Sequence, residues 1–322
     1  IFVEGSQTEK MVCIEKFTVK TRNKSRAKSI FQRNQVEFNK HNQGLSIHGR
    51  NSDSDYQSRL EITIPHKYSV ISSGRSGDVT VIKLEGDIEL KTSGGDLEAT
   101  SIKGAVVLHT SGGDIVLGNV NGTLDLKTNG GDIELENIVS DMKVRTAGGD
   151  ITLYDLKGRG TIKTSGGDIN LKGLEGEDLT IVTSGGDISI DNSNILFNAK
   201  TLGGDIRLSK GIKNHDLETH GGDITIEEIE GDLTAKSIGG DVEVGYVSGQ
   251  TRINTSGGDI ELQQANQDVE LTTSGGDIYL NAAYGNVTAN TSGGDIRVKK
   301  YKHPKGDNDN LSLISSRGDL TC

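Results

Sequence analysis

The sequence has few of the residues that build thick, cross-linked or membrane-embedded cores. Its 322 residues include no Trp, 2 Pro, 2 Cys and 5 Phe, and only 32% of them are hydrophobic. Two cysteines are too few for a disulfide framework or a four-ligand zinc site. No run approaches the roughly 18 apolar residues that a membrane-spanning helix needs. These absences exclude an aromatic-rich core and a disulfide-stapled scaffold, and they predict no transmembrane segment in this chain.

Charge is distributed unevenly along the chain. The net charge is -11 overall, but residues 16–50 carry +8 and residues 1–15 carry -2, which leaves -17 for residues 51–322. A body this acidic repels nucleic acid and anionic membranes, so neither is an expected partner. The basic segment is either a polyanion-binding site or, as its composition favours, a solvated face beside the acidic body.

Glycine, by contrast, is abundant, and 41 of the 44 glycines follow residue 72. Aspartates preceded by glycine recur there at 14 positions, and eleven of the thirteen intervals between them are 18 residues long. One interval is 19 residues, and the last, which contains an insertion over residues 301–310, is 24 residues. The recurring residues are Asp78, Asp96, Asp114, Asp132, Asp150, Asp168, Asp187, Asp205, Asp223, Asp241, Asp259, Asp277, Asp295 and Asp319.

Alignment of the repeats on these aspartates shows which side chains point inward. Apolar residues recur one, three, six, ten and twelve positions after each Asp, and Thr recurs at position fourteen. Two period-2 runs joined by a corner predict two short strands per coil. A strand that returns every 18 residues can satisfy its backbone by pairing with the same strand of the next coil.

The expected fold is therefore all-β, a single-chain parallel β-solenoid, or β-helix, of about 14 coils of 18 residues. At about 4.8 Å per coil the rod is roughly 65 Å long. The general preference for right-handed crossovers predicts a right-handed solenoid.

Two domains are predicted. Residues 73–322 form the β-solenoid repeat domain, and residues 1–72 form an N-terminal capping segment of alternating strands with a candidate short helix over residues 25–33. A cap is expected because an open solenoid end is a strand edge that recruits other chains. No comparable cap follows Asp319, so we expect the C-terminal end to pair with another subunit or with downstream sequence.

Each coil turns at a Gly-Gly-Asp corner that follows the Thr column. The Thr side chains have the inward parity of the core, so their hydroxyls are expected to bond to one another or to backbone at its edge. The glycines are expected to supply positive φ, and each Asp is expected to accept backbone N–H bonds within its own turn. On this interpretation the corner maintains the fold and binds nothing.

The Asp column has a functional alternative, because stacked carboxylates about 5 Å apart repel one another unless they are solvated, hydrogen-bonded or metal-bound. The calcium-binding nonapeptide β-roll also repeats over about 18 residues per turn. Here, however, Asp follows Gly-Gly directly and the second glycine pair of that motif is missing. No cofactor is therefore expected. A divalent-cation (Ca²⁺) site stays the alternative, with these candidate ligands: Asp114, Asp132, Asp150, Asp168, Asp187, Asp205 and Asp223.

No catalytic constellation is visible in the sequence. The 7 histidines are scattered, and none recurs with Cys or a carboxylate at a metal-ligand spacing. Polysaccharide-cleaving β-helices build their sites from long loops and from Asp, Arg or Lys clustered on one face. The one insertion of useful size is that at residues 301–310. A polysaccharide-active enzyme is therefore the least favoured alternative, and we expect no enzymatic activity.

Several motifs together resemble a known family. Residues 60–65 read Leu-Glu-Ile-Thr-Ile-Pro, Val70 follows, residues 76–79 read Ser-Gly-Asp-Val, and Thr-Ser-Gly-Gly-Asp-Ile is then iterated. Over roughly residues 16–322 this pattern is similar to the bacterial adhesin-type β-strand-repeat family, a domain family of unknown function with Ser-Gly-Gly-Asp β-solenoids. The resemblance implies a bacterial envelope protein with an extracellular, cell-surface or periplasmic location, and it supplies no catalytic residues. The chain begins at Ile1 without Met, which is typical of a mature or trimmed product.

The leading hypothesis is a non-enzymatic cell-surface or envelope structural protein that mediates adhesion or self-assembly. Its expected partners are other copies of the chain, or a surface polysaccharide or protein. The alternatives are a Ca²⁺-binding module that uses the Asp column and a polysaccharide-active enzyme. A metal-content measurement separates the first alternative from the leading hypothesis, and sugar release from polysaccharides separates the second.

Overall fold

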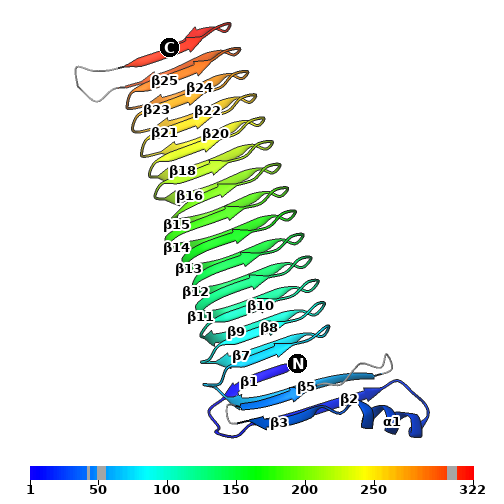
Figure 1. The fold of residues 1–322 in the computed structure, drawn as a ribbon. Coiled ribbons are helices and arrows are strands. Elements are labelled where there is room, and N and C mark those ends of the chain that lie inside the picture. Colours follow the sequence, from blue (N-terminus) through cyan, green and yellow to red (C-terminus); the bar gives the residue numbers. More distant parts are fainter. Residues whose placement is uncertain (42–43, 49–55, 303–309) are drawn as a thin grey trace.

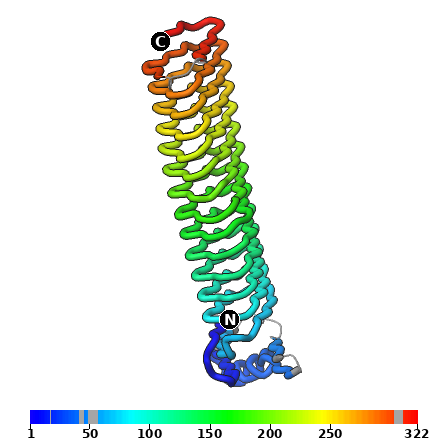
Figure 2. Tube along the Cα trace, turned by 90° about the vertical axis from the view of Figure 1, so that its left-hand side faces the viewer, coloured from blue at the N-terminus to red at the C-terminus, as the bar shows by residue number. Residues whose placement is uncertain are grey.

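The chain forms one long rod of stacked coils (Figures 1 and 2). The computed structural model describes residues 1–322 except 42–43, 49–55 and 303–309, so most of the insertion noted in the sequence lies outside the described residues. The rod is an all-β parallel β-solenoid with about 13 turns of about 18 residues, which confirms the predicted fold class. The fourteen corners from Asp78 to Asp319 enclose thirteen turns, which explains why turns number one fewer than aspartates.

Most coils contribute two parallel strands, one to each face of the rod. The central coils instead contribute one strand each, 13 or 14 residues long, which bends from one face to the next. In chain order the solenoid strands are β6 (Val70–Ser73), β7 (Val79–Leu84), β8 (Ile88–Lys91), β9 (Leu97–Lys103), β10 (Val106–His109), β11 (Ile115–Lys127), β12 (Ile133–Arg145), β13 (Ile151–Lys163), β14 (Ile169–Val182), β15 (Ile188–Lys200), β16 (Ile206–Ile212), β17 (His215–Glu218), β18 (Ile224–Glu230), β19 (Leu233–Lys236), β20 (Val242–Val247), β21 (Thr251–Asn254), β22 (Ile260–Ala265), β23 (Val269–Thr272), β24 (Ile278–Ala283), β25 (Val287–Thr291), β26 (Ile296–Tyr301), β27 (Leu311–Ser315) and β28 (Leu320–Thr321).

The same side chains point inward in coil after coil because the strands pair in register. Between β11 and β12, Ile115 pairs with Ile133 and Leu126 pairs with Val144. These four side chains are at most 1% exposed, and the columns to which they belong continue along the rod as one apolar core. Each inward side chain therefore packs on its counterparts in the neighbouring coils, which buries apolar surface that a single coil could not bury alone.

The N-terminal residues close the first coil in a way that the repeat pattern does not indicate. β1 (Phe2–Ser6) lies between β5 (Tyr56–Pro65) and β7, and it pairs in parallel with both. β2 (Val12–Val19) pairs with β5 in the antiparallel sense. β3 (Glu37–His41) and β4 (Gly44–His48) form a separate hairpin. On the other face β6 already pairs in parallel with β8, so the ladder there begins before residue 73.

A helix lies against β2 at this end of the rod (Figure 1). The helix, α1, spans Lys24–Asn34, in agreement with the short helix expected over residues 25–33. It begins at Asn23, whose side-chain Oδ1 accepts a hydrogen bond from the Arg26 N–H over 3.1 Å. It buries Ile30, which is 2% exposed. Within the described residues no helix has the length and apolarity that a membrane crossing requires.

The two glycines of each Gly-Gly corner differ in their roles, and neither lies in the left-handed region that the sequence predicts, whereas Gly77, the single glycine before Asp78, has a φ of 109°. At the second glycine, such as Gly186, an added Cβ would overlap the carbonyl oxygen of Gly167 in the preceding coil. At the first glycine, such as Gly185, it would lie 3.5 Å from the nearest atom, which is an ordinary contact. The second glycine is therefore required because consecutive coils pass close together at this corner.

We expect Gly186→Ala to lower the free energy of unfolding by more than about 2 kcal/mol, because backbone rather than a movable side chain opposes the added methyl group. Gly185→Ala is the matched control and should change it by no more than about 0.5 kcal/mol. Urea unfolding followed by far-UV circular dichroism measures both values. Equal effects of the two substitutions would contradict this account of the corner.

Candidate functional site

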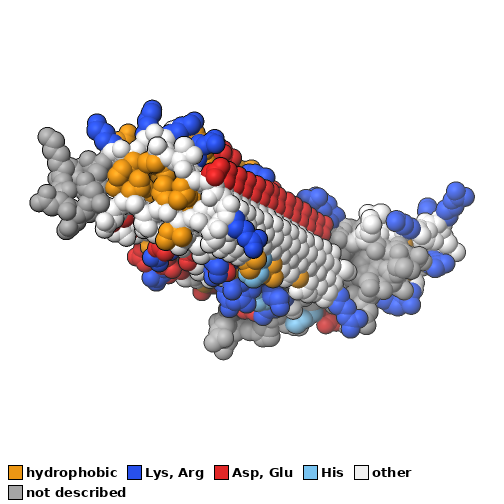
Figure 3. Space-filling view, turned by 90° about the horizontal axis from the view of Figure 1, so that it is seen from above, with side chains coloured by type: hydrophobic (Ala, Val, Ile, Leu, Met, Phe, Trp, Pro, Cys, Tyr) orange, Lys and Arg blue, Asp and Glu red, His pale blue; other side chains and the backbone are white. Residues whose placement is uncertain are grey.

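The recurring aspartates form a hydrogen-bonded column along one edge of the rod, seen as the red row in Figure 3. From Asp96 onward, the backbone N–H of each recurring Asp donates to the Oδ1 atom of the Asp one coil earlier. Asp132 donates to Asp114 over 2.8 Å, and Asp150 donates to Asp132 over 2.8 Å. These bonds run unbroken from Asp78 to Asp319. The expectation that each Asp caps its own turn is therefore wrong, because the bond joins consecutive coils.

All seven candidate metal ligands lie in this column. They are Asp114, Asp132, Asp150, Asp168, Asp187, Asp205 and Asp223. One oxygen of each carboxylate accepts the bond from the next coil, and successive carboxylates are separated by one coil, about 4.8 Å. No group of three or more His, Cys, Asp or Glu side chains in the described part of the chain is placed to hold a metal ion. Ca²⁺ takes roughly six to eight oxygen ligands. A single column of carboxylates places too few oxygens around one point to supply them.

The Thr column beside it joins the coils through their backbone. Thr128 Oγ1 donates to the Gly113 carbonyl over 2.9 Å and accepts from the Gly131 N–H over 3.2 Å. The Thr128 side chain is buried, and both bonds recur in later coils up to Thr291, with Ser237 replacing Thr once. Of the two bonding patterns that the sequence left open, the structure has hydroxyl-to-backbone bonds.

A bend in the first strand of each coil changes its conformation partway along the rod. Five positions after the Asp, the earlier coils have a residue with positive φ, and these residues are Lys83, Ser101, Asn119, Asn137, Asp155, Gly173 and Asn192. The equivalent residues from Lys210 onward lack this conformation. At the bend, one residue of each strand has no partner in the neighbouring strand, and its place also changes along the rod. In β15 the unpaired residue is Asn192 where the strand meets β14, and in β16 it is Ser209 where the strand meets β18. Between β15 and β16 both positions are skipped.

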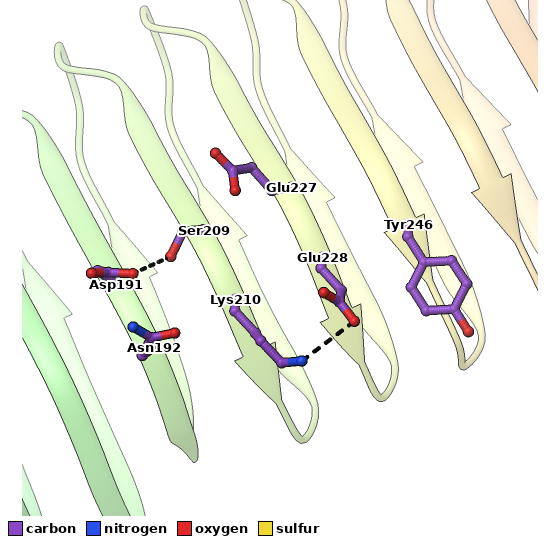
Figure 4. Close-up of a pocket in the computed structure, with 7 residues that line it drawn as sticks. All are labelled: Asp191, Asn192, Ser209, Lys210, Glu227, Glu228 and Tyr246. Carbon is purple, nitrogen blue, oxygen red and sulfur yellow. Dashed lines mark hydrogen bonds and ion pairs between the residues drawn. The ribbon is translucent and has the colours of Figure 1, made fainter.

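A surface groove of about 620 Å³ lies where the two kinds of bend meet (Figure 4). Its lining comes from four successive coils and consists of Asp191, Asn192, Ser209, Lys210, Glu227, Glu228 and Tyr246. The repeat pattern contains a signal for this irregularity, because the apolar position six places after the Asp is Ser193 in one of these coils and Gly211 in the next.

Most charged groups of this groove bond to neighbours in adjacent coils. Asp191 accepts from Ser209 Oγ over 2.6 Å and lies 3.0 Å from Lys172 Nζ, and these two donors lower the pKa of the Asp191 carboxyl. Lys210 Nζ lies 2.9 Å from a Glu230 oxygen and 3.5 Å from a Glu228 oxygen, and these carboxylates raise the pKa of Lys210. The groove is therefore a consequence of the change in bend. Asp191 and Lys210 are already bonded to neighbouring coils, so they are not available as a set of free groups for a ligand.

The core beneath this part of the rod contains a histidine. His215 occupies an apolar column and is 3% exposed, and its ring stacks on Phe197 with centroids 4.1 Å apart. The ring fills the space beside Gly211, where an added Cβ would overlap it. Neither ring nitrogen has a hydrogen-bond partner among the described residues, and burial lowers the pKa of His215 to about 4. His215 is therefore neutral in the folded rod at pH 7.

A column of cations lies on the other side of the same corner. It occupies the position thirteen residues after the Asp in the five coils that begin at Asp78 to Asp150, and alignment of the repeats on their aspartates reveals it. Strand pairing places each member directly beside the next. We call this set the cation column after its Lys and Arg members, and it consists of Lys91, His109, Lys127, Arg145 and Lys163.

The sequence model of a family described as Toastrack DUF4097 matches residues 7–214, 155–268 and 196–322 of the chain. These overlapping matches together extend from residue 7 to residue 322. No curated protein and no solved structure matches the chain. The match names Toastrack rather than the adhesin-type repeat family that the motifs resemble, so the family assignment rests on the Toastrack match.

The Asp column can be tested by separating its hydrogen bonds from its charge. Asp187 Oδ1 accepts the Asp205 N–H over 2.8 Å, and Asn keeps an Oδ1 acceptor at this position. We expect Asp187→Asn to leave the melting temperature nearly unchanged, and Asp187→Ala to cost about 1 to 2 kcal/mol because it leaves the Asp205 N–H without a partner. Thermal unfolding with and without Ca²⁺ measures both effects. A Ca²⁺-dependent stabilisation that Asp187→Asn abolishes would favour the cation site instead.

His215 should make the rod sensitive to acid. The unfolded chain binds a proton at His215 with a pKa of 6.5, whereas the folded chain binds it with a pKa of about 4. The stabilisation is therefore complete above pH 6.5 and is lost as the pH falls towards 4, by about 2 to 3 kcal/mol. We expect His215→Leu to remove this part of the difference in unfolding free energy between pH 7 and pH 4.5. An unchanged pH dependence in that variant would show that His215 is not its source.

Proposed function

The chain belongs to the Toastrack DUF4097 family, and from this premise we propose that it is a non-enzymatic structural rod of the bacterial cell surface or envelope, which acts in adhesion and self-assembly. The family is a β-solenoid domain family of unknown function, so the proposal is argued from the geometry of the rod. We also propose that its partners are other copies of the chain, or a polysaccharide or protein of the bacterial surface.

The unbroken column of Asp bonds carries this proposal. From Asp78 to Asp319, the residue type best suited to chemistry is used at every coil to join one coil to the next. The buried Thr hydroxyls are used in the same way. The Asp and Thr side chains therefore stabilise the stack of coils. The product is a long rod with regular faces, and such a rod suits a structural or adhesive role.

A non-enzymatic role is supported by the bonding inside the groove. An active site needs groups that converge on a position where a substrate can react. Asp191 is instead bonded to Ser209, and Lys210 lies between two carboxylates of neighbouring strands. These groups stabilise the irregular bend.

Repetition supports adhesion for a physical reason. A weak contact that recurs at every coil becomes strong when a rigid rod meets a repetitive surface, because the later contacts form at high effective concentration. The Ca²⁺-binding alternative has less support, because one oxygen of each column carboxylate already accepts an N–H bond and the carboxylates stand in single file.

A shortened rod tests the proposal. Deletion of residues 241–276 removes two complete coils and joins one Gly-Gly corner to the next Asp, so the register of the remaining coils is preserved. We expect the variant to stay folded and to be shorter by about 10 Å in small-angle X-ray scattering. We also expect it to sediment with isolated bacterial envelopes several-fold more weakly than the intact chain, because fewer coils make contact.

Three outcomes would count against this function. One is release of sugar from a panel of envelope polysaccharides by the intact chain, which would indicate an enzyme. Another is envelope binding that requires Ca²⁺, which would favour the cation module. The third is envelope binding that the two-coil deletion leaves unchanged, because that result points to a single local site.

A further inference from the structure

The corner that carries the Asp column also carries a flat strip of small residues. In the coils from Asp96 up to Asp187, one exposed small residue, an exposed glycine and a buried glycine lie between the Thr and the Asp. In the earlier coils the small residue is Ser93, Ser111, Asn129, Ala147, Ser165 or Ser184. The strip loses its flatness at Leu202, whose side chain projects and is 53% exposed. We call the part from residue 93 to residue 186 the glycine strip, and Figure 3 shows the white surface of the corner beside the red row.

Within the glycine strip, the first glycine of each pair has no steric role in the isolated rod. An added Cβ at Gly130, Gly166 or Gly185 would lie 3.5 to 3.7 Å from its nearest neighbour, and none of the three has positive φ. Glycine nevertheless occupies this exposed position in every coil of the strip. The fold does not require it there, and the missing side chain leaves room for close approach from outside.

The cation column forms one margin of this strip, and Lys91 in it pairs with Glu89, whereas its members from Lys127 to Lys163 lack countercharges. Its members stand directly beside one another on paired parallel strands, about 4.8 Å apart, where like charges destabilise the sheet. Within the residues that the structure describes, Lys127, Arg145 and Lys163 form no ion pair, although all three side chains are exposed. A negative partner with the same spacing would relieve this repulsion.

The opposite margin of the strip supplies such a partner on another copy of the chain. The Asp column runs along it, with one oxygen of each carboxylate left over from the bond between coils. When two strips face each other around a two-fold axis parallel to the rods, each cation column meets the Asp column of the other copy. Both copies have the same rise per coil, so the charges match at each coil of the strip. Antiparallel rods would instead place Asp against Asp.

We propose that the glycine strip is a lateral contact between two copies of this chain, which lie side by side and point in the same direction. A free polyanion matches the strip less well, because the Asp column beside the cations would repel it. Only another copy complements both charged margins and the flat strip between them. The contact rests on the self-assembly part of the proposed function but does not depend on adhesion to an envelope, and the two-coil deletion that tests adhesion leaves the strip intact.

Analytical ultracentrifugation of the full chain tests the charged margins. We expect dimers at low ionic strength that dissociate at about 0.5 M salt, because exposed charges are then screened. The triple variant Lys127→Glu, Arg145→Glu, Lys163→Glu should weaken the dimer at least tenfold. The matched control Lys67→Glu, Lys157→Glu, Lys299→Glu reverses three exposed lysines away from the strip and should leave the dimer unchanged. Equal weakening by both sets, or a chain that stays monomeric at low salt, overturns the proposal.

A bulky residue on the strip separates contact from folding. We expect Gly148→Leu with Gly166→Leu to abolish the dimer while the melting temperature stays nearly unchanged, because a Cβ at either position lies at least 3.5 Å from the nearest atom. A dimer that survives these substitutions overturns the proposal. Should this variant be destabilised, the charge reversals above and the cross-links below still decide the question.

Disulfide cross-linking tests the direction of the rods. Native Cys13 and Cys322 are replaced by Ser, and single cysteines are introduced as Ser93→Cys and Ser165→Cys in separate chains. Parallel copies should link position 93 to position 93 and position 165 to position 165 in a mixture of the two. Links between position 93 and position 165 would indicate antiparallel rods and overturn the proposal. Binding of inorganic polyphosphate to the cation column without any dimer would assign the column to a polyanion and also overturn it.

Discussion

A hydrogen bond from the backbone of one coil to the carboxylate of the preceding coil sets the register on which the rest of the rod depends. Each Asp between the two ends of the column is both donor and acceptor, so a column of 2.7 to 3.0 Å bonds extends from Asp78 to Asp319. The Thr hydroxyls add a second set of hydrogen bonds between the same coils, from inside the corner. A shift of the strand register by one residue would break both sets of hydrogen bonds and turn the apolar columns towards water. The corner therefore keeps the core aligned along the whole rod.

Local departures from the repeat show how the core compensates when one column changes. Where the sixth position becomes Ser193 and then Gly211, volume is lost beside the bend. The rings of Phe197 and His215 restore that volume from the tenth position, where most other coils have smaller or aliphatic residues. The result is a packed core with a buried imidazole, and a surface groove where the two kinds of bend meet. The corner tolerates these changes because its own bonds do not involve the sixth or tenth positions.

Much of the fold follows from the sequence because a solenoid converts a period in the chain into a period in space. The 18-residue interval, the inward parity of the apolar columns and the helix near residues 25–33 can all be read from local patterns. The insertion of β1 between β5 and β7 cannot, because that pairing joins residues about sixty to eighty positions apart. The cation column can be read from the same alignment, but the lack of countercharges at Lys127, Arg145 and Lys163 depends on where the side chains of neighbouring coils lie.

The sequence alone determined the repeat, the parallel solenoid and the line of aspartates at its edge, since these depend only on spacing and on which side chains avoid water. The tertiary structure decided which atoms those residues contact. Asp187 could bond within its own turn or to the next coil, and both arrangements use the same residues in the same order. Gly185 and Gly186 are residues of the same type, yet only at Gly186 does the preceding coil leave no room for a Cβ. The distance between coils makes that distinction, and it exists only after they have stacked.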